Sequence, residues 1–157
     1  MRFFLIFIPI FYFNLLNAKS IKCKFEEVYS DGSTQLGEVL FHEGLLRYQY
    51  NEQQLFTIIY NKDFFVIRND NPDIVNKLKK NELLNELTFI LSTYPNIDKK
   101  YSSNNLDIFI EHSVKSDFLK RVSINSVDVN LSIYFIDCQF KELSKQYFQP
   151  FSITKFN

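Results

Sequence analysis

The residues able to do chemistry in this chain are few, and their spacing matches no common catalytic or metal-binding motif. Its two histidines, His42 and His112, have no second ligand at the short spacings of zinc sites, and there is no Cys-x-x-Cys pair. The three glycines form neither a phosphate-binding loop nor a dinucleotide fingerprint, and no Gly-x-Ser-x-Gly elbow supplies a serine nucleophile. We therefore expect no metal, no cofactor and no enzymatic activity.

The two cysteines, Cys23 and Cys138, leave alternatives open. To act as a nucleophile, either thiol would need His112 nearby and an orienting acid such as Asp137. A cysteine enzyme is therefore one alternative, but a structural cysteine on a strand is favoured. A disulfide would join the first strand to one of the last and stabilise the fold by about 4 to 5 kcal/mol on the chain-entropy model. A pair of buried, reduced thiols fits the sequence equally well.

The N-terminus has the composition of a secretory signal peptide. A basic start is followed by an apolar run over 3–16 and by the small residue Ala18. The run is shorter than the stretch of about 20 apolar residues that a membrane-spanning helix needs. We expect a signal peptide over 1–18 and a mature protein in the periplasm, with an uncleaved N-terminal anchor as the alternative. Lys22 before Cys23 argues against a lipid anchor there, because that processing requires a small residue.

The length of 19–157 predicts a single folded domain, and we expect it to be a monomer. Without the signal peptide the chain has 17 basic and 18 acidic residues, so no excess charge would attract nucleic acid or anionic lipid. The full chain holds 18 Phe and 9 Tyr against three Gly and four Pro, which excludes disorder and low complexity. Binding must therefore depend on shape and apolar surface.

The pattern along the chain predicts an α+β fold that is mainly β, built on an antiparallel meander, because links this short can only reverse the chain. The expected strands are 21–29, 37–42, 45–50, 55–60, 64–68, 106–111, 118–124 and 127–140, with a short edge strand in 146–156. The interval 69–100 is expected to hold a helix whose apolar positions 83, 84, 87, 90 and 91 share one face, and which ends at Tyr94-Pro95.

The strands at 55–60 and 64–67 are unusual because they are apolar on both sides of the pleat. Cover by a helix and a second sheet layer, or by a partner of a closed barrel, would explain this. A strongly curved sheet that binds an apolar ligand on its concave side, with the helix as a lid, would explain the apolar faces equally well. For that cavity we predict the lining residues Leu46, Tyr48, Tyr50, Phe56, Ile58, Phe65 and Ile67, and the lid residues Leu87, Phe89, Ile90 and Leu91.

Four segments in this order resemble LolA, the periplasmic carrier of outer-membrane lipoproteins. They are Phe25 to Asp31, Gly37-Glu38-Val39-Leu40-Phe41, Leu46-Arg47-Tyr48-Gln49-Tyr50 and Asn85-Glu86-Leu87-Thr88-Phe89-Ile90-Leu91. The resemblance implies a LolA- or LolB-like half-barrel, an incomplete barrel closed by a helical lid, that holds lipid acyl chains. It also implies an inner-membrane releasing complex and an outer-membrane acceptor as partners.

The chain departs from this family at two places. Lys19-Ser20 leads straight into Ile21 and leaves no room for a helix before the first strand, and Glu43-Gly44 stands where the family has an Arg-Pro step that latches the lid. Arg47 is expected to be a surface or edge residue, and the dispersed carboxylates, Glu27 among them, to be solvated. The predicted function is a carrier of acyl chains, and the alternative is a non-catalytic scaffold with a filled core.

Overall fold

In the computed structural model, which describes residues 20–79, 81–115 and 118–150, the chain forms one antiparallel sheet in the order β6-β5-β4-β3-β2-β1-β10-β9-β8-β7. Its ten strands are β1 (Ile21–Tyr29), β2 (Thr34–His42), β3 (Leu45–Tyr50), β4 (Phe56–Asn61), β5 (Asp63–Arg68), β6 (Val75–Lys77), β7 (Lys100–Ser103), β8 (Leu106–Ser113), β9 (Phe118–Asn125) and β10 (Asn130–Phe140). The predicted signal peptide, 1–18, lies outside the described residues.

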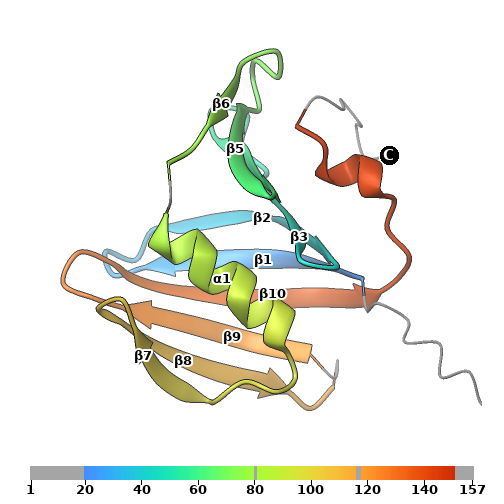
Figure 1. The fold of residues 1–157 in the computed structure, drawn as a ribbon. Coiled ribbons are helices and arrows are strands. Elements are labelled where there is room, and N and C mark those ends of the chain that lie inside the picture. Colours follow the sequence, from blue (N-terminus) through green and yellow to red (C-terminus); the bar gives the residue numbers. More distant parts are fainter. Residues whose placement is uncertain (1–19, 80, 116–117, 151–157) are drawn as a thin grey trace, which may run out of the picture.

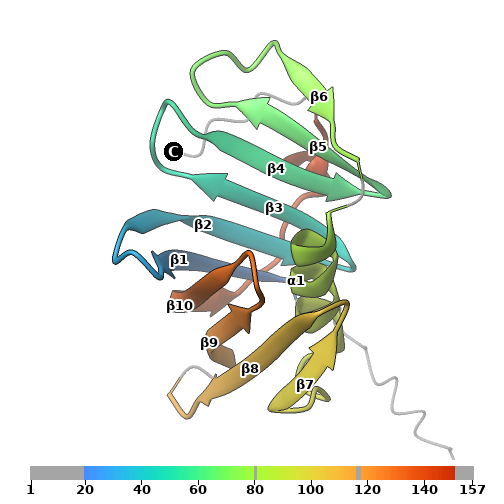
Figure 2. The ribbon, with the colours of Figure 1, turned by 90° about the vertical axis from the view of Figure 1, so that its left-hand side faces the viewer.

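The sheet is open, with β6 and β7 as its edges, and it curves strongly around one helix, α1 (Glu82–Thr93) (Figures 1 and 2). This confirms the prediction of a mainly β fold built on one antiparallel sheet. All the described strands belong to that sheet, so a second sheet layer does not explain the strands that are apolar on both faces.

The topology determines where α1 must lie. The sheet consists of two meanders, β1 to β6 and β7 to β10, which meet where β1 pairs with β10. Because the chain leaves the first meander at one edge and enters the second at the opposite edge, the connection has to cross the sheet, and the concave side is the shorter path. Figure 2 shows α1 on this concave side, between the two halves.

Tight turns produce the hairpins. Glu43 and Gly44 link β2 to β3 with φ angles of 48° and 81°, and Asn104 and Asn105 link β7 to β8 with φ angles of 49° and 62°. Two consecutive positive φ values match the twist of the flanking strands, which is why Gly and Asn are favoured at such links. The expected reversal at Glu43-Gly44 is confirmed.

The interval 69–100 holds more than the predicted helix. α1 begins after Asn81, whose side-chain oxygen accepts a hydrogen bond from the Leu84 amide at 3.0 Å, and it ends before Tyr94. The short strand β6 also lies in this interval, and β7 begins at its last residue, Lys100; neither strand is among those predicted. They are edge strands of three and four residues, too short to show a periodic pattern.

The C-terminal segment packs on the convex face of the sheet, and the predicted edge strand in 146–156 is absent from the part that the structure describes. Lys145–Phe148 forms a 3-10 helix instead, and the rest of the predicted strand, 151–156, lies outside the described residues. Leu143 and Phe148 pack on Leu40 of β2 in a second apolar cluster. The part of the outer face around Leu40 is therefore covered by the C-terminal segment.

Candidate functional site

The predicted cavity residues of β3 and β4 share the concave face, because antiparallel partners that lie directly opposite point to the same side of a sheet. Leu46 pairs with Tyr60 and Tyr48 with Ile58, and all four side chains belong to or pack against the main core cluster. Tyr50 lies on the same face at the end of β3, next to Phe56, which is 38% exposed. The prediction that these side chains share one face is correct.

The predictions for β5 are wrong by one residue. Ile58 pairs with Val66, while Phe65 pairs with Ile59 and Ile67 with Thr57. Phe65 and Ile67 therefore lie on the convex face, and the β5 residues on the concave face are Phe64 and Val66. A strand that is apolar on both faces carries no alternation from which its register could be determined.

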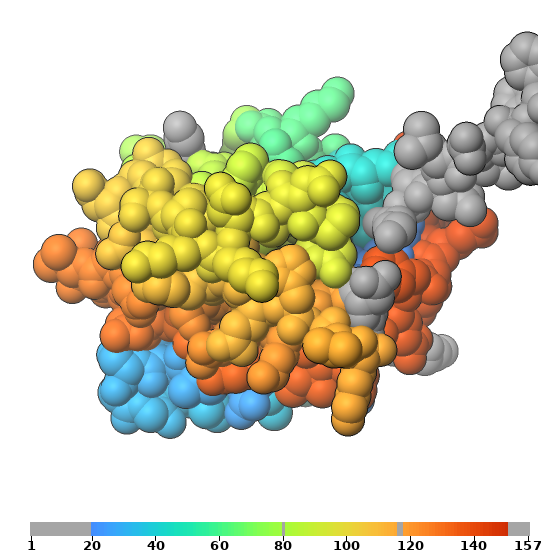
Figure 3. Space-filling view, turned by 90° about the horizontal axis from the view of Figure 1, so that it is seen from below, coloured from blue at the N-terminus to red at the C-terminus, as the bar shows by residue number. Residues whose placement is uncertain are grey.

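Three of the four predicted lid residues face the sheet. Leu87, Ile90 and Leu91 are buried in the main core cluster, and Leu84 joins them one turn earlier. Phe89 lies at the side of α1, beside the Tyr101 ring of the edge strand β7, and is 50% exposed, so its assignment to the buried inner face is wrong. Seen from below, the yellow to gold atoms of the segment that contains β7 and β8 lie directly against the orange atoms of β9 (Figure 3). The burial of the α1 side chains shows that the helix packs on the sheet in this structure.

An aromatic cluster lines the concave face where β1, β2 and β3 meet. The Phe25 ring stacks on Tyr48 with centroids 4.0 Å apart and meets Tyr50 edge-on at 5.6 Å. The close approach depends on Gly37, which pairs with both Phe25 and Tyr50. A Cβ at Gly37 would lie 2.2 Å from the Gln49 carbonyl oxygen and 2.3 Å from Phe25 Cζ.

The same face holds a buried carboxylate, Glu27. The expectation that this residue is solvated is wrong. Glu27 is 3% exposed, and its Oε1 accepts a hydrogen bond from the Tyr48 hydroxyl at 2.8 Å. Its Oε2 accepts from Tyr29 at 2.5 Å and from Tyr50 at 3.0 Å. The signal was available, since Glu27 has the parity of the buried residues Ile21, Cys23 and Phe25 in β1.

Three tyrosines thus share one carboxylate. Burial, together with the Glu27 carboxylate, raises the pKa values of the Tyr29, Tyr48 and Tyr50 hydroxyls above their usual range. The hydroxyls therefore stay protonated and remain hydrogen-bond donors at neutral pH. These three hydrogen bonds allow the Glu27 carboxylate to be buried in an otherwise apolar concave face without a cation to pair with it.

Arg47, predicted as a surface or edge residue, is 8% exposed and lies on the convex face. Its guanidinium donates hydrogen bonds to the Tyr147 carbonyl at 3.2 Å and to the Gln49 side chain, and burial lowers its pKa. Asn61 donates to the neighbouring Phe148 carbonyl at 3.3 Å. These bonds attach the C-terminal segment to β3 and β4, a role for Arg47 that is separate from the concave face.

A disulfide joins Cys23 to Cys138, which settles the choice between bonded and reduced cysteines. It connects the two meanders, because Cys23 lies in β1 and Cys138 in β10. The register of this pair shifts beside Asp137, whose φ of 51° marks a bulge. The oxidised sulfur atoms offer no thiolate for the nucleophilic role considered for Cys138.

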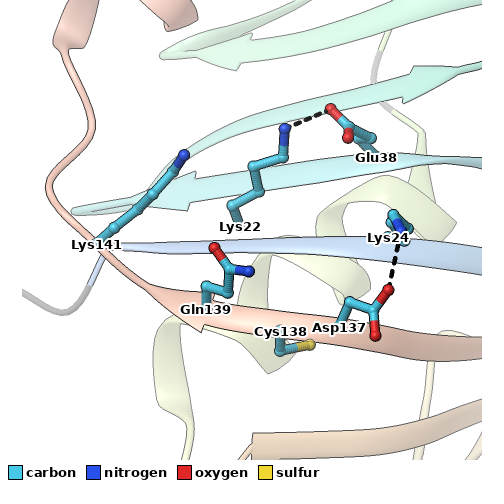
Figure 4. A pocket seen from close by; sticks show the side chains of 7 residues that line it. All are labelled: Lys22, Lys24, Glu38, Asp137, Cys138, Gln139 and Lys141. Carbon is cyan, nitrogen blue, oxygen red and sulfur yellow. Dashed lines mark hydrogen bonds and ion pairs between the residues drawn. The ribbon is translucent and has the colours of Figure 1, made fainter.

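A polar depression of about 430 Å³ lies beside the disulfide on the convex face (Figure 4). Two ion pairs line it, Lys22 with Glu38 at 2.8 Å and Lys24 with Asp137 at 2.9 Å. Lys141 and Gln139 also line it, so its lining is mostly charged and polar and is unsuited to an acyl chain. The apolar concave face under α1 is the candidate site.

No protein-family model and no curated protein matches the chain. Within the described part of the chain, no helix has both the length and the hydropathy needed to cross a bilayer. In the same residues, no three His, Cys, Asp or Glu side chains are grouped in a way that could hold a metal ion. The geometry of the concave face is therefore the basis for the functional argument.

Proposed function

We propose that this protein is a periplasmic carrier that holds the acyl chains of a lipoprotein, or of another lipid, between the concave face and α1 and delivers them toward the outer membrane. The observation that carries the proposal is the position of α1, which lays Leu84, Leu87, Ile90 and Leu91 against an apolar, curved sheet whose two edges it connects. These four side chains occupy the space that an acyl chain would take.

The energies of the two occupants are comparable. Four buried aliphatic side chains contribute about 6 to 12 kcal/mol, at about 1.5 to 3 kcal/mol each. A saturated chain of about fourteen methylene groups gains about 11 kcal/mol, at about 0.8 kcal/mol per CH₂. Because a bound chain would replace the contacts of α1 at a similar free energy, α1 can be displaced by the cargo and can return when the cargo leaves. Release then requires no chemical step.

Two further features support an exported carrier. The Cys23–Cys138 disulfide is a bond that persists in oxidising compartments such as the bacterial periplasm. The open sheet with one covering helix agrees in outline with the LolA- or LolB-like half-barrel that the sequence resembles. That resemblance also supplies the proposed partners, an inner-membrane releasing complex and an outer-membrane acceptor.

The departure at the latch position has a consequence for this mechanism. Glu43, at the position of the family's latch, lies in the β2–β3 turn and pairs with Lys145 at 3.1 Å, on the C-terminal segment. The contacts that hold α1 on the sheet are mainly those of its apolar side chains. We therefore expect the affinity for cargo to depend on the packing of α1 rather than on a single polar contact.

The test is titration of the mature protein, 19–157, with a fluorescent fatty acyl probe. We expect saturable binding, and we expect Ile90→Ala to raise probe affinity by about tenfold or more while lowering stability. The reason is that truncating a buried Ile costs about 2 to 5 kcal/mol, which here destabilises the closed position of α1 and raises the binding-competent fraction. Ser92→Ala, at an exposed position of the same helix where the side chain bonds to the Thr88 carbonyl, is the control and should leave affinity unchanged.

A scaffold with a filled core is the second candidate, and one observation favours it. Leu46, Tyr48 and Ile90 are at most 1% exposed, so the concave face is already covered by the chain's own side chains. A scaffold would not bind the probe, and Ile90→Ala would only lower its stability. Binding that strengthens when α1 is loosened is the result that separates the carrier from the scaffold.

A further inference from the structure

Two buried polar groups between α1 and β7 have no hydrogen-bond partner among the described residues. They are the Oε2 atom of Glu86 and the hydroxyl of Tyr101. Glu86 is only 8% exposed, although it carries a carboxyl group. An unpaired polar group in such a place costs free energy, so its presence points to a ligand that completes it.

The two groups are neighbours on the concave side. Tyr101 pairs with the fully buried Ile108, which places its ring on the concave face of the edge strand β7. Phe89, one turn after Glu86 in α1, meets the Tyr101 ring edge-on at 6.3 Å. Burial first, and the Glu86 charge second, raise the pKa of the Tyr101 hydroxyl, so this hydroxyl remains protonated at neutral pH.

The chemistry of the pair selects the ligand. A carboxylate accepts hydrogen bonds only, whereas a tyrosine hydroxyl both donates and accepts. An ammonium group carries three donors and a positive charge, so it could bond to both oxygens and neutralise Glu86. An anionic head group would be repelled by Glu86, and an aliphatic chain would leave both groups unpaired.

We propose that Glu86 and Tyr101 form a subsite under α1 that binds the primary amine of an amphiphilic guest whose hydrocarbon chain lies on the concave face. This rests on the proposed function, because the chain must be accommodated before its head group can reach the subsite. The preferred cargo would then carry a positive charge at one end. The nearly zero net charge of the protein gives no sign of this preference, because it comes from one local carboxylate.

The experiment compares three competitors of equal chain length, dodecylamine, dodecanol and dodecanoic acid, for displacement of a neutral fluorescent acyl probe. We expect dodecylamine to displace the probe at a concentration at least about tenfold lower than the other two, the difference that about 1.4 kcal/mol gives. Glu86→Gln should bring the amine and the alcohol to within about twofold. Glu82→Gln, which changes an exposed carboxyl group in the first turn of the same helix, should keep the preference.

A second variant keeps the test valid if Glu86→Gln does not fold. Tyr101→Phe removes a buried hydroxyl that has no partner, so the fold should tolerate it while the amine preference falls. If all three competitors displace the probe equally, the amine subsite is refuted and the acyl site stands. If the protein binds no probe, the proposed function fails and the subsite fails with it.

Discussion

Breaking the Cys23–Cys138 disulfide should remove a large part of the stability of this fold. The two cysteines are 115 residues apart, and the chain-entropy relation converts a closed loop of that size into about 5 kcal/mol. A domain of this size typically has a urea slope of about 2 kcal/mol/M, so the midpoint of unfolding should fall by about 2 to 3 M urea. Urea unfolding followed by circular dichroism, with and without a thiol reductant, measures the shift.

The double variant Cys23→Ala and Cys138→Ala is the control. It should unfold near the midpoint of the reduced protein, or slightly below it because Cys23 is fully buried, and the reductant should not change it. A shift of less than about 0.5 M for the native protein would contradict the argument, since it would amount to only about 1 kcal/mol at that slope. In that case residual structure would already hold the two cysteines near each other in the unfolded chain, or the bond would strain the folded state.

Three further predictions follow from the concave face and its helix. Because the raised pKa values of Tyr29, Tyr48 and Tyr50 favour the protonated hydroxyls in the folded state, their contribution to stability is complete below about pH 10 and is lost as pH rises above it. A spectrophotometric titration should show these tyrosines ionising only as the protein unfolds, and their ionisation in the folded state with the ordinary pKa would refute the Glu27 cluster. Gly37→Ala should lower the free energy of unfolding by about 1 to 3 kcal/mol, because its Cβ would clash with Phe25 and the β3 backbone, and urea unfolding with an unchanged midpoint would contradict this. Asn81→Ala removes the N-terminal cap of α1, costs about 1 kcal/mol and should speed amide hydrogen exchange at Leu84 about fivefold, while exchange in β1 stays unchanged.

Much of the fold could be predicted from the sequence because local chemistry determined it. Glu43-Gly44 between two apolar runs required a reversal, and the residues of α1 at helical spacing predicted its buried face. Leu83 is the one member of that face that is only half-buried. The curved sheet follows from the run of short links, although the sequence did not reveal which strand would join the two meanders.

The wrong predictions concern residues whose position is not determined by the hydrophobic pattern of their own strand. The register of β5 follows from Lys62, which has a φ of 64° and makes Asn61 pair with Asp63. Counting outward from this turn pairs Ile58 with Val66, whereas the apolar run alone fits either register. For Arg47, the missing information was the path of the C-terminal segment, a tertiary contact that no local pattern encodes.

The burial of Glu27 could have been predicted from strand parity, but its partners could not. The three tyrosines that bond to it come from β1 and β3, and their convergence depends on the pairing of both strands with β2. The Glu86 subsite was hidden for a similar reason. Its environment is created by β7, a strand of four residues that is adjacent to α1 only in the folded chain.

The order of the strands has a consequence for the way the protein is made. Among the described strands β1 is synthesised before all the others, yet in the folded sheet it is flanked by β2 on one side and by β10 on the other. One backbone edge of β1 therefore stays without its native neighbour until β10 has been synthesised as well. Exposed strand edges of this kind are prone to pair with other chains. The nascent protein thus needs protection against aggregation until β10 is available to pair with β1.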